Sequence, residues 1–145
     1  MEMKAKLNFD AEEKLKEFGF SFERQSTVKD TYFKNETGIL KVTEDKGKLV
    51  LTNFIKTSSG FESDSTEINS SIKKEIEKEF EADAVIEKGM KFYKKENLTA
   101  QINIIPGLGK YLTVQGREDE VKKVFEFLKI NKFELKGFNE LIKFQ

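Results

Sequence analysis

Alternation of apolar and polar residues predicts β-strands over most of this chain. In the first segment Met3, Ala5 and Leu7 share one face, and Lys4 and Lys6 lie on the other. Further strands are expected at residues 20–26, 28–34, 39–44, 48–56, 59–68, 84–95, 98–105 and 110–116. Short turn-forming sequences, such as NETG, EDKGK, KEN and PGLG, separate many of them, so the strands should pair as antiparallel neighbours.

Four segments have the spacing of helices instead. Residues 11–18 should form a short helix with Asp10 and Glu13 as a capping box, and residues 70–80 a second helix capped by Ser70 or Ser71. Residues 117–130 place apolar side chains on one stripe, and the tail from residue 135 predicts a short fourth helix. The order of elements predicts a single α+β domain over residues 1–145. Its core would be an antiparallel, roughly eight-stranded, closed or nearly closed tunnel barrel with flanking helices.

Composition narrows the chemistry that such a fold can carry. The 26 basic and 26 acidic residues cancel, which gives no general attraction to nucleic acid or membrane and predicts neither as a partner. Without cysteine or histidine the chain has no thiol nucleophile, imidazole base or conventional zinc site, and any metal would need oxygen ligands. Neither a signal segment nor a long apolar run is found, so a cytoplasmic location is expected. The sequence favours no particular oligomeric state.

Several short motifs, in the right order, resemble the CYTH superfamily, the triphosphate tunnel enzymes that include class IV adenylyl cyclases and thiamine triphosphatases. EMKAKL stands where that family has E-x-E-x-K, QSTVKDTYF where it has Q-x-D-x-Y-F, and GILKV where it has G-x-x-L-R-I-R. KLVLTNF, IEKGMKFYKK, INIIPGLGKYLTVQG and GFNELI match later motifs. The resemblance implies a tunnel lined by basic residues for triphosphate oxygens and by carboxylates for magnesium or manganese.

Many of the family's charged positions are replaced in this chain. Lys4 stands in place of the second acid of the first strand, and Thr43 in place of an arginine. Apolar side chains stand at two further basic positions, Phe54 and Met90. Three neutral side chains stand where the resemblance implies carboxylates: Asn103, Thr113 and Gln115. Alternation places these polar residues opposite apolar ones, on the face that would line a lumen.

The surviving charges define a candidate anion site without metal. Its proposed ligand-binding residues are the lysines of the polar strand faces, Lys4, Lys6, Lys41 and Lys88, and no catalytic residue is assigned. In the alternative interpretation these lysines extend to the tunnel mouths or pair with Glu2, Glu62 and Glu67, while apolar side chains fill part of the lumen. Metal ligands are not expected; Glu2 and Glu62 are the weak candidates.

Three functional hypotheses follow. In the first, the tunnel domain has lost metal-dependent triphosphate chemistry and at most binds a phosphorylated small molecule, with no cofactor. In the second, it is an active divergent triphosphatase or adenylyl cyclase-like enzyme that uses Mg²⁺ or Mn²⁺. In the third, it is a structural protein whose lumen is plugged by Phe54 and Met90.

Overall fold

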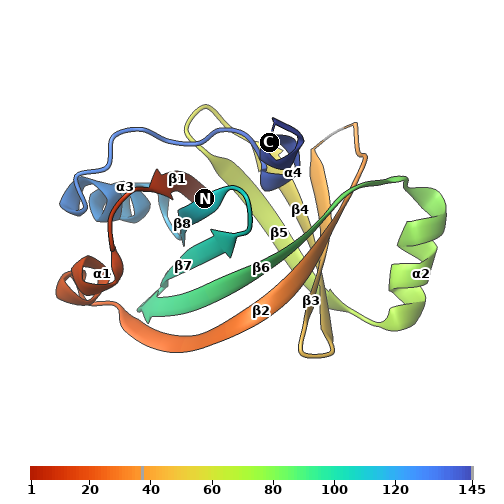
Figure 1. The fold of residues 1–145 in the computed structure, drawn as a ribbon, viewed down its shortest axis with the longest axis horizontal. Coiled ribbons are helices and arrows are strands. Elements are labelled where there is room, and N and C mark those ends of the chain that lie inside the picture. The colour runs from red at the N-terminus through yellow and green to blue at the C-terminus, as the bar shows by residue number, and fades with distance from the viewer. Residues whose placement is uncertain (37, 145) are drawn as a thin grey trace.

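A computed structural model describes residues 1–36 and 38–144 and contains the predicted closed barrel of eight antiparallel strands (Figure 1). The spatial order of the strands is β1-β5-β4-β3-β2-β6-β7-β8, and β8 pairs with β1 to close the sheet. The strands are β1 (Glu2–Leu7), β2 (Ser21–Phe33), β3 (Ile39–Asp45), β4 (Lys48–Lys56), β5 (Phe61–Ile68), β6 (Ala82–Lys95), β7 (Leu98–Ile105) and β8 (Gly109–Gln115). The helices are α1 (Glu12–Phe18), α2 (Ser70–Glu79), α3 (Glu118–Phe127), α4 (Phe138–Leu141) and the 3₁₀ turn η1 (Ile142–Phe144).

Two long strands hold the halves of the barrel together. β2 and β6 pair along nearly their whole length and sweep across the molecule, between the β3–β5 side and the β7, β8 and β1 side (Figure 1). The two strands expected at residues 20–26 and 28–34 are therefore one strand: Thr27, which lies between them, pairs with Gly89 of β6 in an unbroken register. The register shifts lie nearer the two ends of β2, between Phe22 and Arg24 and between Tyr32 and Phe33, and they do not end the strand.

The barrel closes through a short seam. β1 contacts β5 through the single register pair Glu2–Phe61, whereas its other edge pairs with β8 over its full length. Gly60 makes the close approach possible, because a Cβ at this position would lie 2.2 Å from the Glu2 carbonyl oxygen. The seam between β1 and β5 therefore depends on glycine at position 60.

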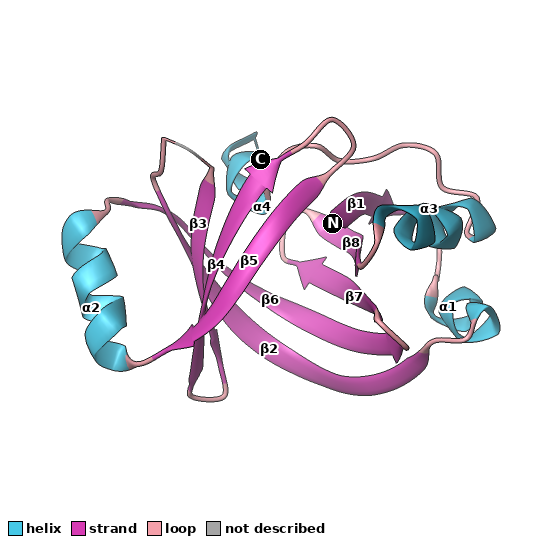
Figure 2. Ribbon diagram, turned by 180° about the vertical axis from the view of Figure 1, so that it is seen from behind, coloured by secondary structure: helices cyan, strands magenta, loops and turns pink. Residues whose placement is uncertain are grey.

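The helices cover the outside of the barrel and one of its ends (Figure 2). Leu15 of α1 and Phe125 of α3 pack in one apolar cluster with Leu112 of β8, while Ile76 of α2 packs against Val42 on the opposite side. α4 lies across an end of the barrel, where Phe138 joins a third cluster with Tyr111. Because the buried apolar strand faces point outward to the helices, the polar strand faces point inward.

The helix starts differ from the expected caps. Asn69, not Ser70 or Ser71, caps α2: its Oδ1 accepts a hydrogen bond of 2.9 Å from the Ile72 amide. The capping box expected at Asp10 is not formed, since Asp10 lies before the helix and accepts from the Glu12 amide at 3.1 Å. Within the described residues, the helices are all too short or too polar to cross a bilayer.

Candidate functional site inside the barrel

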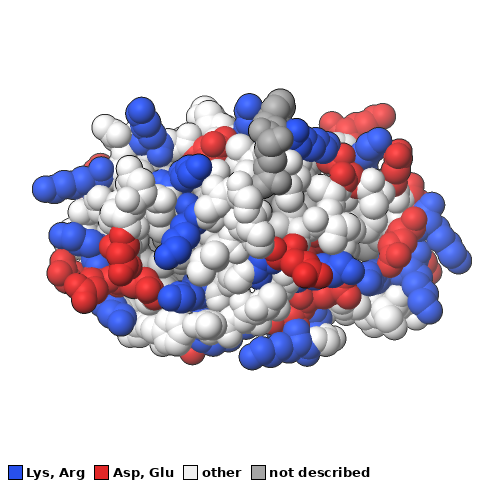
Figure 3. All heavy atoms as spheres, in the orientation of Figure 1, with Lys and Arg blue, Asp and Glu red and all other residues white. Residues whose placement is uncertain are grey.

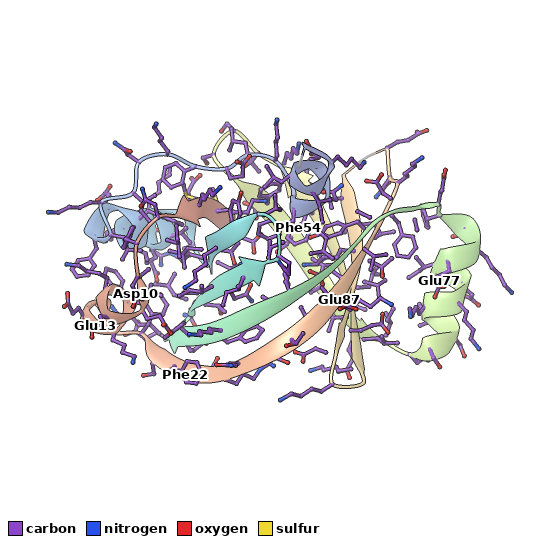
Figure 4. All side chains as sticks on the ribbon, in the orientation of Figure 1. Asp10, Glu13, Phe22, Phe54, Glu77 and Glu87 are labelled. Carbon is purple, nitrogen blue, oxygen red and sulfur yellow. The ribbon has the colours of Figure 1, made fainter. Side chains whose placement is uncertain are left out.

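The lumen contains two adjoining cavities. The inner cavity, about 40 Å³, lies beneath α4, and its lining includes Lys4, Lys88 and Phe138. The mouth cavity, about 230 Å³, extends toward the β3–β4 turn, and its lining includes Arg24, Asp30 and Lys48. The two cavities share four lining residues, Glu2, Lys41, Phe54 and Gln101. Figure 4 labels Phe54, which lies below α4 in that view, at the boundary between the two spaces.

Asp30 is the centre of the buried charges. Its Oδ2 lies 3.0 Å from Lys88 Nζ and 3.8 Å from Lys41 Nζ, and its Oδ1 accepts a hydrogen bond of 2.5 Å from Thr43 Oγ1. β2 places the carboxylate between its two neighbours, because β3 carries Lys41 and Thr43 and β6 carries Lys88. Burial alone would raise the pKa of Asp30, but the two lysines and the Thr43 hydroxyl outweigh it and lower the pKa to about 2. Asp30 therefore stays ionised at neutral pH.

Lys4 is buried without such a partner. Only 4% of the residue is exposed, and its Nζ lies 4.7 Å from the ring centroid of Phe61 and 4.3 Å from that of Phe138. Among the described residues no carboxylate forms an ion pair with it. Burial lowers the pKa of Lys4 to about 8; Lys88 and Lys41 act in the same direction, and Glu2 and Glu134 oppose them. Burial also lowers the pKa of Lys88, despite its pairing with Asp30.

The structure brings together three of the four lysines expected at an anion site. Lys4, Lys41 and Lys88 all line the inner cavity. Lys6 lies near the end of β1, is exposed, and lines neither cavity; its Nζ lies 6.0 Å from the Tyr111 ring centroid. Strand alternation puts Lys6 on the same side as Lys4, but the lumen ends before it. Anion binding by these lysines remains a prediction.

The two weak metal-ligand candidates lie apart. Glu2 lines both cavities. The Glu62 side chain is 59% exposed and forms an ion pair of 3.3 Å with the amino group of Met1, outside the lumen. Glu67 pairs with Lys48 at 3.9 Å in an exposed position, so neither acid compensates the inner lysines as the alternative interpretation expected.

Neutral polar groups line the wall where the resemblance implied carboxylates. Asn103 and Thr113 line the inner cavity, and Gln115 lines the mouth cavity. Asn103 Nδ2 donates to Thr113 Oγ1 at 3.3 Å, and Thr113 Oγ1 donates to Gln101 Oε1 at 3.2 Å. These side chains satisfy one another and add no charge to the wall.

At the open end, Arg24 and Asp45 form a charged rim. Their ion pair measures 3.0 Å, Asp45 also accepts a 2.6 Å hydrogen bond from Ser26, and the Arg24 guanidinium lies 4.0 Å from the Phe92 ring centroid. Along both cavities the ionisable lining comprises five cations (Lys4, Arg24, Lys41, Lys48 and Lys88) and three carboxylates (Glu2, Asp30 and Asp45). Because Lys48 pairs with Glu67 outside the lining, the lining has an excess of one positive charge. On the face in Figure 3, by contrast, both signs intermingle, in keeping with the zero net charge.

Sequence reasoning missed Asp30 and Phe138. Asp30 shares strand parity with Val28 and Tyr32, a signal that could have placed it inward once the lumen face of β2 was known. Phe138 covers Lys4 and Lys88 from a helix remote in the sequence, and no local pattern indicates that contact.

The donor set in the lumen does not fit a divalent cation. Two of its three carboxylates already neutralise basic side chains, Asp30 with two lysines and Asp45 with Arg24. Among the described residues there is no group of three acidic side chains that could hold a metal. A cation near Glu2 would also be repelled by the lysines that share the inner cavity with it.

Comparison with known proteins shows the fold. No family model matches the sequence, and neither does any curated protein. A solved structure from Pyrococcus horikoshii has 24% identity and a TM-score of 0.80, covering 97% of this chain and 98% of that chain. A "putative adenylate cyclase" from Vibrio parahaemolyticus has 11% identity and a TM-score of 0.78, covering 99% and 97%. Another from Bacillus halodurans has 8% identity and a TM-score of 0.64, covering 94% and 92%.

Proposed function

We propose that the barrel binds a small phosphorylated ligand at Lys41, with Lys88 and Lys4 contributing their positive charge from the adjoining inner cavity, and that it carries out no metal-dependent triphosphate chemistry. The observation that carries the proposal is the imbalance of charge inside the lumen. Lys41 and Lys88 pair with Asp30, the one fully buried carboxylate among the described residues, while Lys4 lines the same inner cavity as these lysines without a carboxylate partner, in a protein with no net charge. Unpaired cations are costly to desolvate, and an entering anion offsets that cost.

The dimensions of the lumen indicate where such a ligand would sit. The mouth cavity of about 230 Å³ is somewhat smaller than typical pockets for drug-sized molecules, which favours a compact ligand. Lys41 lies at the junction of the cavities, so its ammonium group can reach an anion held in the mouth. Hydroxyl groups around that space, those of Thr52, Ser63 and Ser65, supply neutral donors for further phosphate oxygens, whereas the Thr43 hydroxyl already donates to Asp30.

The absence of metal chemistry in this proposal rests on the carboxylates. Phosphoryl transfer requires metal ions or fixed cations that neutralise charge developing on the phosphate oxygens. The lysines can supply fixed charge, but Asp30 is engaged by them and Asn103, Thr113 and Gln115 bring none of the carboxylates that would hold a metal. Binding without turnover is the consequence we propose.

Titration calorimetry with tripolyphosphate, in low salt and EDTA, tests this proposal. Lys41→Met should weaken binding by about 10- to 100-fold, the effect of losing one charge-assisted hydrogen bond, and raised salt should weaken it further. The matched control is Lys6→Met, which removes the same charge from an exposed position on β1 and should change the affinity less than about twofold. Equal effects of the two substitutions would refute a luminal site.

The second candidate is an active triphosphatase or adenylyl cyclase-like enzyme, favoured by the fold shared with the two bacterial proteins named as putative adenylate cyclases. It predicts release of phosphate or pyrophosphate from a nucleoside triphosphate when Mg²⁺ or Mn²⁺ is added. Glu2 is the free luminal carboxylate, so Glu2→Gln should abolish that turnover. Turnover that depends on metal and Glu2 would replace the binding proposal.

A further inference from the structure

Lys4 is an amine enclosed in a space suited only to a very small reactant. The inner cavity of about 40 Å³ has room for roughly three water molecules, at about 10–15 Å³ of probe volume each. The rings of Phe61 and Phe138 bound the space beside Nζ, and the ring of Phe54 stands at the boundary with the mouth cavity. A linear triatomic molecule has as many heavy atoms as three waters and should fit this space, whereas a tetrahedral phosphate has five and is expected to remain in the larger mouth cavity.

We propose that Lys4 is a carbon dioxide acceptor, whose Nζ forms a carbamate inside the inner cavity. The neutral amine donates its lone pair to the carbon of CO₂, the N–C bond forms, and one C–O π pair moves onto oxygen. One N–H proton is released to solvent, so the products are a carbamate anion and a proton. No oxidant, reductant, metal or cofactor takes part.

The first argument is the fraction of reactive amine. Only the unprotonated form of a lysine attacks CO₂, and the pKa of Lys4 is lowered to about 8, so near pH 8 about half of it is neutral. An exposed lysine with an ordinary pKa is less than about one per cent neutral at the same pH. Burial therefore gives the amine of Lys4 a neutral fraction roughly 100-fold above that of a lysine with an ordinary pKa.

The second argument is the charge that the product would meet. Lys41 and Lys88 face Lys4 across the inner cavity and repel its ammonium form, and they would attract a carbamate in the same place. Glu2 and Glu134 act in the opposite direction, and Lys88 is already paired with Asp30. Lys41, whose Nζ is farther from Asp30, at 3.8 Å, is the cation best placed to turn toward the new anion.

The third argument is access. CO₂ is neutral and pays little to leave water, so it can pass from the mouth cavity through the boundary at Phe54 without a counter-charge. Bicarbonate and phosphate are charged and larger, and would be retained in the mouth cavity. The modification and the anion binding proposed above therefore involve different spaces and can be tested separately.

The test is carbon-13 NMR of the full chain in ¹³C-bicarbonate buffer near pH 8, without phosphate, compared for the unaltered protein, Lys4→Met and Lys6→Met. A carbamate resonance, distinct from those of bicarbonate and dissolved CO₂, should appear in the unaltered protein and in Lys6→Met. In Lys4→Met the resonance of the Lys4 carbamate should be absent, and only signals shared by all three proteins, from the terminal amine and surface lysines, should remain.

Chemical trapping makes the result independent of whether Lys4→Met folds. Alkylation of the carbamate oxygen, followed by digestion and fragmentation mass spectrometry that separates Lys4 from the Met1 amine, should place the added ester on the Lys4 side chain, at least tenfold above any other lysine. A carbamate spread evenly over surface lysines, or the same resonance in a folded Lys4→Met protein, would overturn the proposal. Loss of tripolyphosphate binding with the carbamate intact would refute only the proposed function.

Discussion

Replacing Asp30 with asparagine removes the carboxylate that, alone among the described residues, pairs with two luminal lysines. The amide keeps the size of the side chain and can still accept from the Thr43 hydroxyl, but it leaves Lys88 and Lys41 without their counter-ion. Asp30 is 1% exposed, so solvent cannot compensate for the lost charge. The substitution therefore measures the contribution of the Asp30 negative charge to stability.

Two estimates give the loss in free energy of unfolding that Asp30→Asn should cause. The pKa of Asp30 falls from 3.8 to about 2 on folding, and that shift corresponds to about 2 kcal/mol of stability at neutral pH. Removing one partner of a buried ion pair generally costs about 3–5 kcal/mol, because the remaining charge is uncompensated. We therefore expect Asp30→Asn to lower the free energy of unfolding by about 2–5 kcal/mol.

Urea denaturation followed by circular dichroism at pH 7 measures this loss. Asp64→Asn is the matched control, since Asp64 is exposed on β5 and its replacement should change the stability by less than about 0.5 kcal/mol. In Asp30→Asn, tripolyphosphate should raise the free energy of unfolding more than in the unaltered protein, because the ligand takes the place of the lost carboxylate. Asp30→Asn as stable as Asp64→Asn would refute the ion cluster.

Three further predictions concern the seam between β1 and β5, the pH dependence of stability due to Lys4, and the Phe138 ring that covers Lys4. Gly60→Ala should destabilise the barrel by about 1–3 kcal/mol in urea denaturation, whereas Gly89→Ala, whose nearest atom would lie 3.8 Å from the new Cβ, should be tolerated; equal losses would contradict the seam. The unfolded chain binds the Lys4 proton up to its ordinary pKa of 10.5 and the folded chain only up to about 8. Between pH 8 and pH 10.5 the free energy of unfolding should therefore rise by about 3 kcal/mol relative to that of Lys4→Met. If the free energies of unfolding of the two proteins change in parallel with pH, the lowered pKa of Lys4 is contradicted. Phe138→Ala should cost about 3–5 kcal/mol and raise the Lys4 pKa measured by NMR, because water then reaches Nζ; an unchanged pKa would argue against the ring as its cover.

The stability that Asp30 contributes depends on pH with the same sign, in an acidic interval, because its pKa is also lowered on folding. As the pH falls below about 4, the unfolded chain takes up this proton first, and the folded chain resists protonation until about pH 2. The stability that Asp30 contributes should therefore be present above pH 4 and disappear between pH 4 and 2. A stability difference between the unaltered protein and Asp30→Asn that stays constant across this interval would contradict the assigned pKa.

The fold was predictable because the alternation of the strands is regular. Residues 110–116 carry Leu112 and Val114 on one face and Thr113 on the other, and the structure buries the first two beneath helices and turns the third into the lumen. Strand ends were less predictable. β2 continues through Thr27, where two strands were expected to meet, because β6 pairs with it on both sides of that residue, a tertiary effect invisible in the local pattern.

The candidate site was predictable only in part, for a geometric reason. Strand parity identifies which side chains share a face, and it correctly groups Lys41 with Thr43. It does not say where along the strand the lumen ends, so Lys6 could not be distinguished from Lys4. Nor does it show which carboxylate from another strand meets which lysine, and so Asp30 was overlooked. Such contacts depend on the register between strands, which is set by the closed barrel.

The most direct test of the central claim is to follow the lysine Nζ resonances by NMR during a titration with tripolyphosphate in EDTA. We predict that the signals of Lys4, Lys41 and Lys88 shift together and saturate, that Lys6 stays in place, and that the pKa of Lys4 rises above about 8 as the anion binds. Shifts confined to exposed lysines, or luminal shifts that appear only after Mg²⁺ is added, would contradict a metal-independent anion site in the barrel.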